Sequence, residues 1–392
     1  MRQLRPGVRL GPYRLGRKLA HGGMGDVYLA YPRSGVGEPL ALKVLHRSRT
    51  ASERAVQKFR AEARLTSCLS HPNLVEVFDS GENGGWHYLA MELVDGVTLA
   101  ELWEALRKRK RHLPIELVSF LGRGILSALS HVHGQVGDDR RPLKVVHRDV
   151  TPNNVMVSTR GEVKLIDFGI AHGLHVPSDT VPGTLRGTLE YVAPEQLRGR
   201  PVDGRTDVHG AAVTIFFAAT GRSAFWRGNE RDSLEAVLDE PLPDLLQLRA
   251  DAPLSLCTAL RKATEKSPDG RFSSAADFQR ALPPVSSRAP AELGKLVREL
   301  CGQAVAQEGR VRLATLEESR RAALWGGALG LSAALFLAAG VVFFSPPRSA
   351  LNAASPTSIK PRTSAHARQV KKKAPPAATK QPERYRKLRS SK

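Results

Sequence analysis

A short polar segment enclosed by two apolar runs limits the folds open to this chain of 392 residues. The segment, residues 147–154, reads His-Arg-Asp-Val-Thr-Pro-Asn-Asn, and Asp167 follows further along in Leu-Ile-Asp-Phe-Gly. We expect the apolar runs to be strands that end side by side, so that Asp149, Asn154 and Asp167 meet. Two carboxylates and an amide suit a magnesium ion and a hydroxyl nucleophile. The fold must therefore hold these strand ends together.

A glycine-rich turn lies near the start of the chain, where residues 20–26 read Ala-His-Gly-Gly-Met-Gly-Asp. Strand-like runs lie on both sides of it, whereas a dinucleotide-binding turn would lead into a helix. Because Gly22, Gly23 and Gly25 carry no Cβ, their backbone N–H groups can approach phosphate oxygens closely. A glycine-rich hairpin is most often only a turn, so this feature needs support from the rest of the chain.

One lysine, Lys43, interrupts the apolar strand-like run Ala-Leu-Lys-Val-Leu. A lysine buried in a strand is costly unless it meets an anion. Helical spacing places Glu62 on the same face as Val56 and Phe59, so Glu62 is the expected partner. Either charge alone is usually solvated. Together they predict an ion pair beside a phosphate.

The apolar pattern of residues 13–283 changes halfway along. Short runs typical of strands dominate as far as Leu93, with one helical pattern between Ser52 and Leu69. After Leu99 the apolar residues recur at every third or fourth position, which is typical of helices. The sequence therefore predicts an α+β protein with a small strand-rich lobe followed by a larger helical lobe.

The order of these motifs resembles that of the eukaryotic-type protein kinases, in their bacterial serine/threonine branch. The resemblance covers residues 13–283 and implies a bilobal protein-kinase-like fold with ATP in the cleft. It implies an enzyme that transfers the γ-phosphate of ATP to serine or threonine of protein substrates, with Mg²⁺, or alternatively Mn²⁺, as the cofactor ion. Thr188, near the end of the activation segment, favours serine and threonine over tyrosine as acceptors by analogy.

The resemblance also implies roles for individual residues. Asp149 would be the catalytic base, with Lys43 and Arg148 beside it, and Asn154 and Asp167 would be the metal ligands. The ATP-binding residues, which come from the glycine-rich turn, the lysine strand, the facing helix and the hinge, are Leu19, Gly22, Gly23, Gly25, Val27, Lys43, Glu62, Met91, Glu92 and Val94.

Further downstream, residues 187–195 read Gly-Thr-Leu-Glu-Tyr-Val-Ala-Pro-Glu and look like the end of an activation segment. By the same resemblance, Asp207 matches an aspartate that anchors the catalytic loop. Arg271 matches an arginine that pairs with Glu195.

The loop between residues 169 and 187 is punctuated by glycine and proline and carries three hydroxyls. A phosphate on such a loop can order it. We expect autophosphorylation at Thr184 and Thr180. Arg148 directly precedes Asp149 and would clamp that phosphate.

Two residues depart from the kinase pattern. Ala20 replaces the first loop glycine, which is a small change. Thr151 replaces the lysine that usually steadies the transferred phosphoryl group, and loss of such a cation is expected to slow transfer. An alternative function is therefore that of a nucleotide-binding pseudokinase scaffold.

Residues 322–344 contain no charged side chain. As a helix they would span about 34 Å, which is enough for the hydrocarbon core of a membrane. Arg320 and Arg321 precede them, and prolines follow. The sequence predicts one transmembrane helix in the cell's inner or plasma membrane. The kinase domain would be cytoplasmic, because it needs ATP, and would act in transmembrane signalling.

The regions on either side of this helix have different expected structures. Residues 284–321 predict a helical juxtamembrane linker, and residues 345–392 predict a disordered, basic, proline-rich tail. The tail suggests an alternative function, the binding of an anionic cell-envelope polymer. A dimer is a further expected assembly.

The net charge of +21 is concentrated in the tail, because residues 346–392 carry thirteen basic side chains against Glu383 alone. The remainder of the chain is only moderately basic, which argues against a specific nucleic-acid partner. The three cysteines are scattered without a Cys-x-x-Cys spacing, which excludes a disulfide framework.

Overall fold

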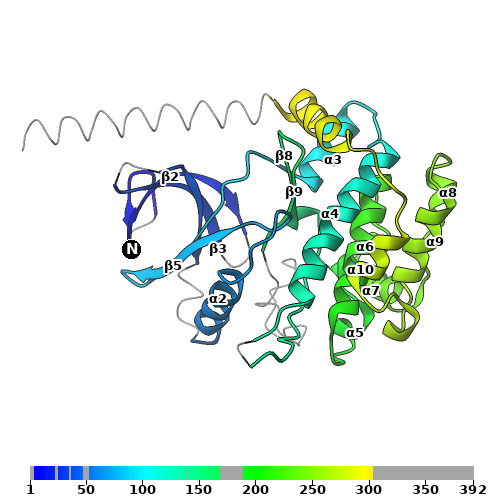
Figure 1. Ribbon diagram of the computed structural model, residues 1–392, viewed down its shortest axis with the longest axis horizontal. Coiled ribbons are helices and arrows are strands. Elements are labelled where there is room, and N and C mark those ends of the chain that lie inside the picture. The colour runs from blue at the N-terminus through cyan, green and yellow to red at the C-terminus, as the bar shows by residue number, and fades with distance from the viewer. Residues whose placement is uncertain are drawn as a thin grey trace, which may run out of the picture. The chain divides into compact units, whose positions relative to one another are not determined.

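The computed structural model describes residues 4–22, 25–34, 37–46, 53–137, 139–167 and 189–302. Strands dominate the first part of these residues, drawn in blue, and helices dominate the second part, drawn in green and yellow (Figure 1). The predicted strand-rich lobe followed by a helical lobe is therefore confirmed. The expected transmembrane helix and basic tail lie outside the described residues.

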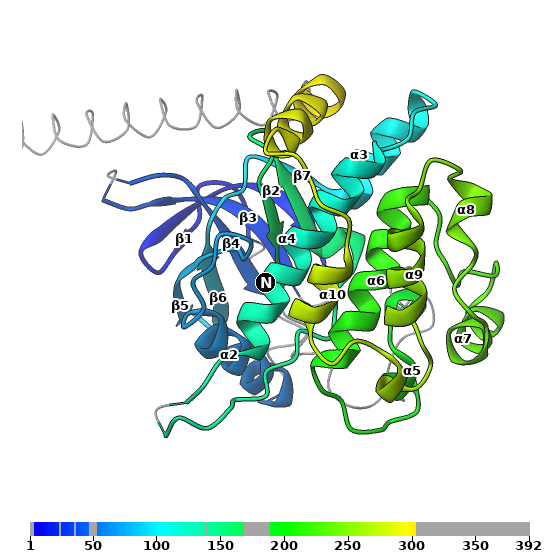
Figure 2. The same ribbon diagram turned by 45° about the vertical axis from the view of Figure 1, so that its right-hand side comes forward.

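A six-stranded antiparallel sheet forms the first lobe, with the strand order β1-β2-β3-β4-β6-β5. Its strands are β1 (Arg9–Leu10), β2 (Tyr13–His21), β3 (Gly25–Pro32), β4 (Leu40–Leu45), β5 (Val77–Asn83) and β6 (Trp86–Met91). Figure 2 shows β2, β3 and β4 as neighbours. The glycine-rich turn therefore joins two adjacent strands, as the sequence predicts.

Helix α2 (Glu53–Thr66) covers one face of this sheet. Its apolar side chains Val56, Phe59 and Ala63 pack with Leu45 of β4. Burial of this stripe holds the helix on the sheet, because each buried methylene group contributes about 0.8 kcal/mol. The same face of the helix carries Glu62 toward the centre of the sheet.

One expected strand begins in a different place. The apolar run Leu74–Phe78 is one of the short runs that are typical of strands, whereas the strand runs from Val77 to Asn83. Leu74 instead forms an isolated parallel bridge with Leu165 in the second lobe. Its buried side chain belongs to the core of the helical lobe, so an apolar run that looks like one strand is shared between two lobes.

The second lobe contains the longer helices of the described chain. Its helices are α3 (Leu99–Lys108), α4 (Ile115–His133), α5 (Pro194–Leu197), α6 (Gly204–Thr220), α7 (Glu230–Asp239), α8 (Leu245–Leu248), α9 (Leu254–Ala263) and α10 (Ala275–Ala281), with 3-10 turns η1 (Pro152–Asn154), η3 (Leu189–Tyr191) and η4 (Pro268–Gly270). Nearly every side chain of α6 is buried, which makes it the central helix of the lobe.

Helices α4 and α6 pack closely because α4 has a glycine, Gly122, where it faces α6. A Cβ at Gly122 of α4 would lie 2.8 Å from a methyl group of Ile215 of α6. Among the described residues, α4 is the single helix long and apolar enough to cross a membrane. More than half of its most apolar window is buried within the protein, which identifies it as a core helix.

A small second sheet in the order β7-β8-β9 carries the polar segment. It consists of β7 (Gly96–Thr98), β8 (Val155–Ser158) and β9 (Val163–Leu165), all antiparallel.

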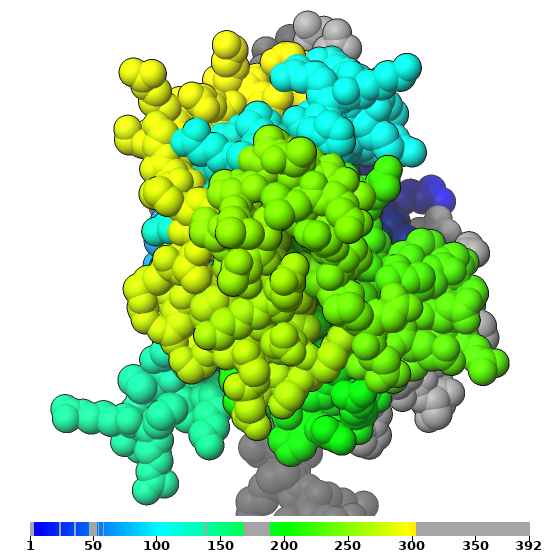
Figure 3. Space-filling model, turned by 90° about the vertical axis from the view of Figure 1, so that its right-hand side faces the viewer, coloured from blue at the N-terminus to red at the C-terminus, as the bar shows by residue number. Residues whose placement is uncertain are grey.

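The segment that follows residue 283 begins with a helix, residues 289–302. Its apolar side chains Ala289, Leu293 and Val297 are buried in the core of the helical lobe. Glu299 forms an ion pair with Arg111, which follows α3. Figure 3 shows this yellow end of the described chain against the cyan surface near α3. The first part of the expected linker is thus packed against the helical lobe.

Candidate active site

The β8–β9 hairpin brings Asn154 and Asp167 to the same end. Val155 at the start of β8 lies opposite Leu165 at the end of β9. Asn154 therefore directly precedes the hairpin and Asp167 closely follows it. The N–H of Ile166 donates to the carbonyl of Asn154 at 2.9 Å, which extends the ladder beyond the strands.

Asp149 reaches this place by a different route from the one expected. The apolar run before it, which includes Val145 and Val146, forms no strand. Instead the backbone N–H groups of His147 and Arg148 each donate to the carboxylate of Asp207 in α6 at 2.7 Å. The strand expectation is wrong at this point, and the two N–H groups that follow the apolar run bond to a buried carboxylate and not to a neighbouring strand.

Asn154 holds the side chain of Asp149. Its Nδ2 donates to Oδ2 of Asp149 at 2.7 Å and to the carbonyl of Asp149 at 2.9 Å. Since the amide nitrogen is used in this way, Oδ1 is the Asn154 atom suited to a cation. One asparagine can thus orient a base and present an oxygen ligand.

Lys43 of β4 contacts one carboxylate from each lobe. Its Nζ lies 3.2 Å from Oε1 of Glu62 and 2.9 Å from Oδ1 of Asp167. Burial alone would lower the pKa of Lys43, but the carboxylates of Asp167 and Glu62 raise it above its usual value. Lys43 therefore stays protonated, and the ion pair with Glu62 expected from helical spacing is present.

These residues fit magnesium and a triphosphate. Asn154 and Asp167 supply the hard oxygen atoms that Mg²⁺ prefers, and Lys43 supplies a fixed positive charge. At the turn, a Cβ on Gly25 would lie 2.3 Å from the carbonyl oxygen of Val44, so only glycine allows this close approach.

An apolar cluster lies on the face of the sheet that α2 covers. Leu19, Val27 and Met91 belong to one cluster, although they come from three strands. Ala41, which lies opposite Met91 in the β4–β6 pair, belongs to the same cluster and was missed by the sequence analysis. Its position two residues before Lys43 on the same strand face is the signal that would have found it.

The hinge residues lie where β6 ends. Glu92 donates its N–H to the carbonyl of Glu76 at 2.8 Å, and its carboxylate accepts a hydrogen bond from Lys164 at 2.8 Å. Val94 is buried close by. The hinge is therefore tied to both lobes. Of the remaining expected site residues, Gly23, Thr180 and Thr184 lie outside the described part of the chain.

Three further residues support the loop of residues 147–154, and the sequence analysis did not name them. His133 contacts Oδ2 of Asp207 at 2.7 Å, Thr214 donates to the carbonyl of Val150 at 2.9 Å, and Gln196 donates to the carbonyl of Arg148 at 3.3 Å. No spacing rule identifies them, because each meets the loop from a distant part of the chain.

The expected pair of Glu195 and Arg271 is present and deeply buried. Arg271 donates from two nitrogens to the two carboxylate oxygens, both at 2.8 Å, and Thr206 donates to Oε1 of Glu195 at 2.7 Å. A bidentate pair of this kind fixes orientation as well as charge.

Thr151, which stands where kinases usually carry lysine, is buried with 4% of its surface exposed. Its carbonyl accepts the N–H of Asn154 at 3.0 Å. This hydrogen bond closes a turn within the loop, and the short side chain of Thr151 adds no positive charge to the site.

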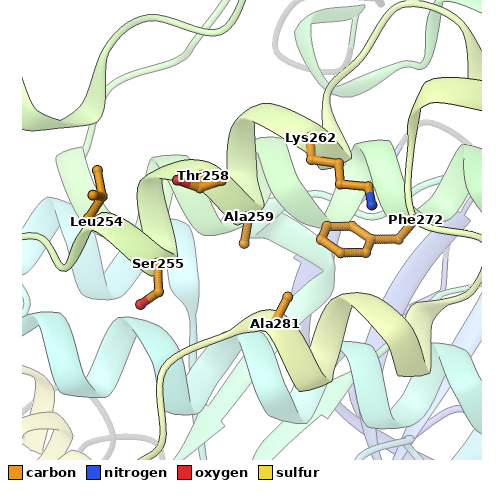
Figure 4. Close-up of a pocket in the computed structure, with 7 residues that line it drawn as sticks. All are labelled: Leu254, Ser255, Thr258, Ala259, Lys262, Phe272 and Ala281. Carbon is orange, nitrogen blue, oxygen red and sulfur yellow. The ribbon is translucent and has the colours of Figure 1, made fainter.

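A separate hollow lies in the helical lobe, between α9 and the segment that includes α10 (Figure 4). Leu254, Phe272 and Ala281 line it, and the ammonium of Lys262 lies 4.6 Å from the centre of the Phe272 ring. None of the residues that line it belongs to the expected catalytic or ATP-binding set.

A strand-rich lobe with a buried lysine–glutamate pair, above a helical lobe with an aspartate–asparagine loop, defines the class of the protein kinases. The family model described as the protein kinase domain matches residues 13–301, and this chain belongs to that family. The match continues beyond residue 283, where we expected the domain to end, and includes most of the packed helix over residues 289–302.

Curated relatives agree with this assignment. The chain is 34% identical to the tyrosine-protein kinase MasK of Myxococcus xanthus over 69% of this chain and 42% of that one. It is 36% identical to the serine/threonine-protein kinase Pkn1 of Myxococcus xanthus over 70% of this chain and 38% of that one. The chain thus spans about two fifths of the length of these relatives.

A solved structure supports the same fold. The PknI kinase domain of Mycobacterium tuberculosis superposes with a TM-score of 0.55 at 29% identity, covering 71% of this chain and 98% of that one. The predicted bilobal kinase fold is therefore confirmed.

Proposed function

We propose that this protein is an ATP-dependent serine/threonine protein kinase that uses magnesium. One observation carries the proposal: Lys43 contacts Asp167, Asn154 contacts Asp149, and the backbone hydrogen bond from Ile166 to Asn154 brings these two pairs together. Each side chain has the charge or hydrogen-bonding group that phosphoryl transfer needs. Family membership adds that ATP and a divalent ion are used.

Asp149 would act as the base for the substrate hydroxyl. Its Oδ2 accepts a hydrogen bond from Asn154, which fixes the orientation of the carboxylate that would receive the proton. The proton would pass to Asp149 as the hydroxyl oxygen attacks phosphorus. The backbone on the N-terminal side of Asp149 is held by Asp207, so the base has little freedom to move.

Lys43 would hold the α- and β-phosphates, and Asn154 and Asp167 would hold magnesium. Bound magnesium ATP supplies the phosphoryl group and neutralises charge on its β- and γ-phosphates. Glu62 keeps Lys43 in place through the 3.2 Å contact, and Lys43 also reaches Asp167 directly. The adenine would lie against Leu19 and Val27 and bond to the hinge.

The proposal also specifies which amino acids of the protein substrate accept the phosphate. Pkn1 is named a serine/threonine-protein kinase and MasK a tyrosine-protein kinase. We favour serine and threonine by analogy with serine/threonine kinases, because Thr188 lies near the end of the segment that resembles their activation segment. Phosphoamino-acid analysis of a labelled generic protein substrate distinguishes the two. Label confined to tyrosine would contradict this choice.

Arg148 supports autophosphorylation at Thr184 and Thr180. Its Nε is buried and has no hydrogen-bond partner among the described residues. Its backbone φ of 70° is left-handed and is held by Asp207. A phosphate that bonds to Arg148 would therefore act directly on the residue before Asp149. Peptide mapping after incubation with ATP should find phosphate on Thr184 or Thr180, and its absence between residues 169 and 187 would contradict this role.

The membrane anchor rests on the uncharged run of residues 322–344. We propose a single-pass protein of the inner or plasma membrane with a cytoplasmic kinase domain, acting in transmembrane signalling. The basic tail would then lie outside and could meet an anionic envelope polymer, and the chain could dimerise. Fractionation with alkaline extraction tests the anchor, and release into the soluble fraction would contradict it.

The central test uses the full chain in detergent with radiolabelled ATP and magnesium. Wild type should transfer label to itself and to a protein substrate, whereas Asp149→Asn should not. Binding of ATP by both proteins, with no transfer by either, would instead support the pseudokinase alternative raised by Thr151. Repeating the assay with manganese establishes which ion is preferred.

A further inference from the structure

Two histidines and an aspartate meet at the base of the glycine-rich turn. His21 ends β2, Asp26 lies opposite it in β3, and His46 directly follows β4. Nδ1 of His21 lies 2.6 Å from Oδ1 of Asp26, and Nε2 of His46 lies 3.1 Å from the same oxygen. The three donor atoms lie within 4.8 Å of one another. Three adjacent strands thus aim three metal-binding atoms at one place.

The two imidazole rings are held in a shared orientation. Their centres lie 5.2 Å apart with an angle of 26° between their planes, so His21 and His46 stack on the same side of Asp26. The side chain of Asp26 is 16% exposed, that of His46 is 25% exposed and that of His21 is 72% exposed. Two of the three ligands are therefore mostly buried and His21 is mostly exposed, so an ion can enter without unfolding the sheet.

Asp26 is kept in its charged form. Its other oxygen, Oδ2, contacts Nζ of Lys18 at 2.7 Å and the hydroxyl of Tyr28 at 3.3 Å. An ionised carboxylate with one oxygen occupied by Lys18 presents the other to the two imidazoles.

This donor set selects among metals. Imidazole nitrogens favour zinc and its neighbours in the first transition row, whereas magnesium favours a shell of oxygens. Zinc bonds to histidine and carboxylate at about 2.0–2.2 Å, and many zinc sites have three protein ligands plus water. In such a site the ligand atoms stand about 3.3 Å apart, so the 2.6 Å contact between His21 and Asp26 must lengthen by less than 1 Å.

We propose that His21, Asp26 and His46 form a binding site for a divalent transition metal, with zinc as the ion of reference. Water completes the coordination. The ion would connect the two ends of the glycine-rich turn to the end of β4.

Titration of the untagged full chain with Zn²⁺ and Co²⁺ in millimolar magnesium tests the site. Zn²⁺ affinity is measured by competition with a chromogenic chelator, and Co²⁺ is used because its visible absorption reports coordination number. We expect wild type to bind one more equivalent than the His21→Gln/His46→Gln double variant. Each single variant should bind at least about tenfold more weakly.

His112→Gln is the matched control. His112 is also exposed and lies against an aromatic ring, that of Trp103, but it is not part of the cluster. This variant should keep the wild-type affinity and Co²⁺ spectrum. Equal Zn²⁺ stoichiometry, affinity and Co²⁺ spectra for the double variant and wild type would overturn the proposal and leave the cluster as a hydrogen-bond network.

Hydrogen exchange provides a test that needs no variant and no kinase activity. Zn²⁺ should slow amide exchange in the wild-type peptide that contains His21 and Asp26, and magnesium alone should not. Unchanged exchange in that peptide at saturating Zn²⁺ would also overturn the proposal. Because neither readout uses phosphate transfer, an inactive kinase would not affect the result.

Discussion

The carboxylate of Asp207, in the buried helix α6, accepts the backbone N–H of Arg148 at 2.7 Å. Arg148 has a φ of 70°, a conformation that residues other than glycine rarely adopt. The hydrogen bond holds the backbone in this conformation one residue before Asp149. The position of the proposed base therefore depends on the core of the helical lobe.

Asp207→Ala should lower kcat at least tenfold with a smaller effect on the KM for ATP, because the base moves while Lys43 stays in place. The free energy of unfolding should fall by about 2 kcal/mol, since two buried N–H groups lose a charged acceptor. Steady-state kinetics and urea denaturation measure these effects. Asp269→Ala, which removes a carboxylate that is 89% exposed, is the control and should change neither value. Wild-type kcat in Asp207→Ala would contradict this account of loop anchoring.

Arg271→Ala should lower the free energy of unfolding by about 3–5 kcal/mol, because it leaves Glu195 buried without its partner. Urea denaturation measures the change. Arg231 forms an exposed pair with Glu235 on one helix, and Arg231→Ala should have almost no effect. Equal stability of the two variants would show that burial of the Glu195 pair has no energetic consequence.

Stability should fall in mild acid, partly because of His209. This residue is fully buried on α6, neither ring nitrogen has a hydrogen-bond partner among the described residues, and the ring stacks on Phe225. Burial, together with the nearby charges of Arg271 and Lys266, holds the pKa of His209 well below its usual value of 6.5.

The unfolded state therefore binds a proton below pH 6.5 that the native state does not bind at His209. The contribution of this residue to stability is complete above pH 6.5 and is lost as the pH falls, by up to about 1.4 kcal/mol per pH unit. His209→Leu should flatten the decline between pH 7 and pH 5 in urea denaturation, whereas His112→Leu should not. An unchanged slope in His209→Leu would refute this assignment.

Lys43→Met should abolish phosphate transfer, and so should Asp167→Asn, since each removes a charge proposed to hold the triphosphate or magnesium. Labelled transfer by either variant at the wild-type rate would contradict the proposed roles.

Burial raises the pKa of Glu62, and loss of the Lys43 ammonium would raise it further. The double variant Lys43→Met/Glu62→Gln should therefore be more stable at neutral pH than Lys43→Met alone, as thermal unfolding can show.

Thr151→Lys should raise kcat with little change in the KM for ATP, because an added cation would act mainly on the transferred phosphoryl group. Thr151 is buried, so the longer lysine side chain does not fit in the space that the threonine side chain fills. Thr151→Met is the control for side-chain length without charge and should not raise kcat. A fall in kcat for Thr151→Lys would indicate that the site is built around the hydroxyl.

Several parts of this architecture could be predicted because the signal is local. The spacing of Val56, Phe59 and Glu62 predicts which face of α2 meets the sheet, and the structure confirms the contact of Glu62 with Lys43. The switch from short apolar runs to helical spacing predicts the two lobes. The roles of these residues in catalysis stay predictions until the variants are measured.

Other parts depended on contacts that have no local signal. The run before Asp149 looks like a strand, yet it forms none, and the N–H group of His147 directly after it bonds to Asp207, which lies 60 positions further along the chain. Backbone N–H groups are the same in every residue except proline, so the sequence does not show which acceptor they will meet. The register of β2 with β3 likewise decided that His21 lies opposite Asp26.

The sequence by itself determined the order of the lobes, the chemical groups of the site and the pairing of Lys43 with Glu62. These follow from hydrophobic periodicity and from the cost of burying a charge. Only the tertiary structure decided how Asp149 is supported and that His46 joins His21 and Asp26. Such contacts arise where separate elements pack, and packing depends on the shape and register of the whole core.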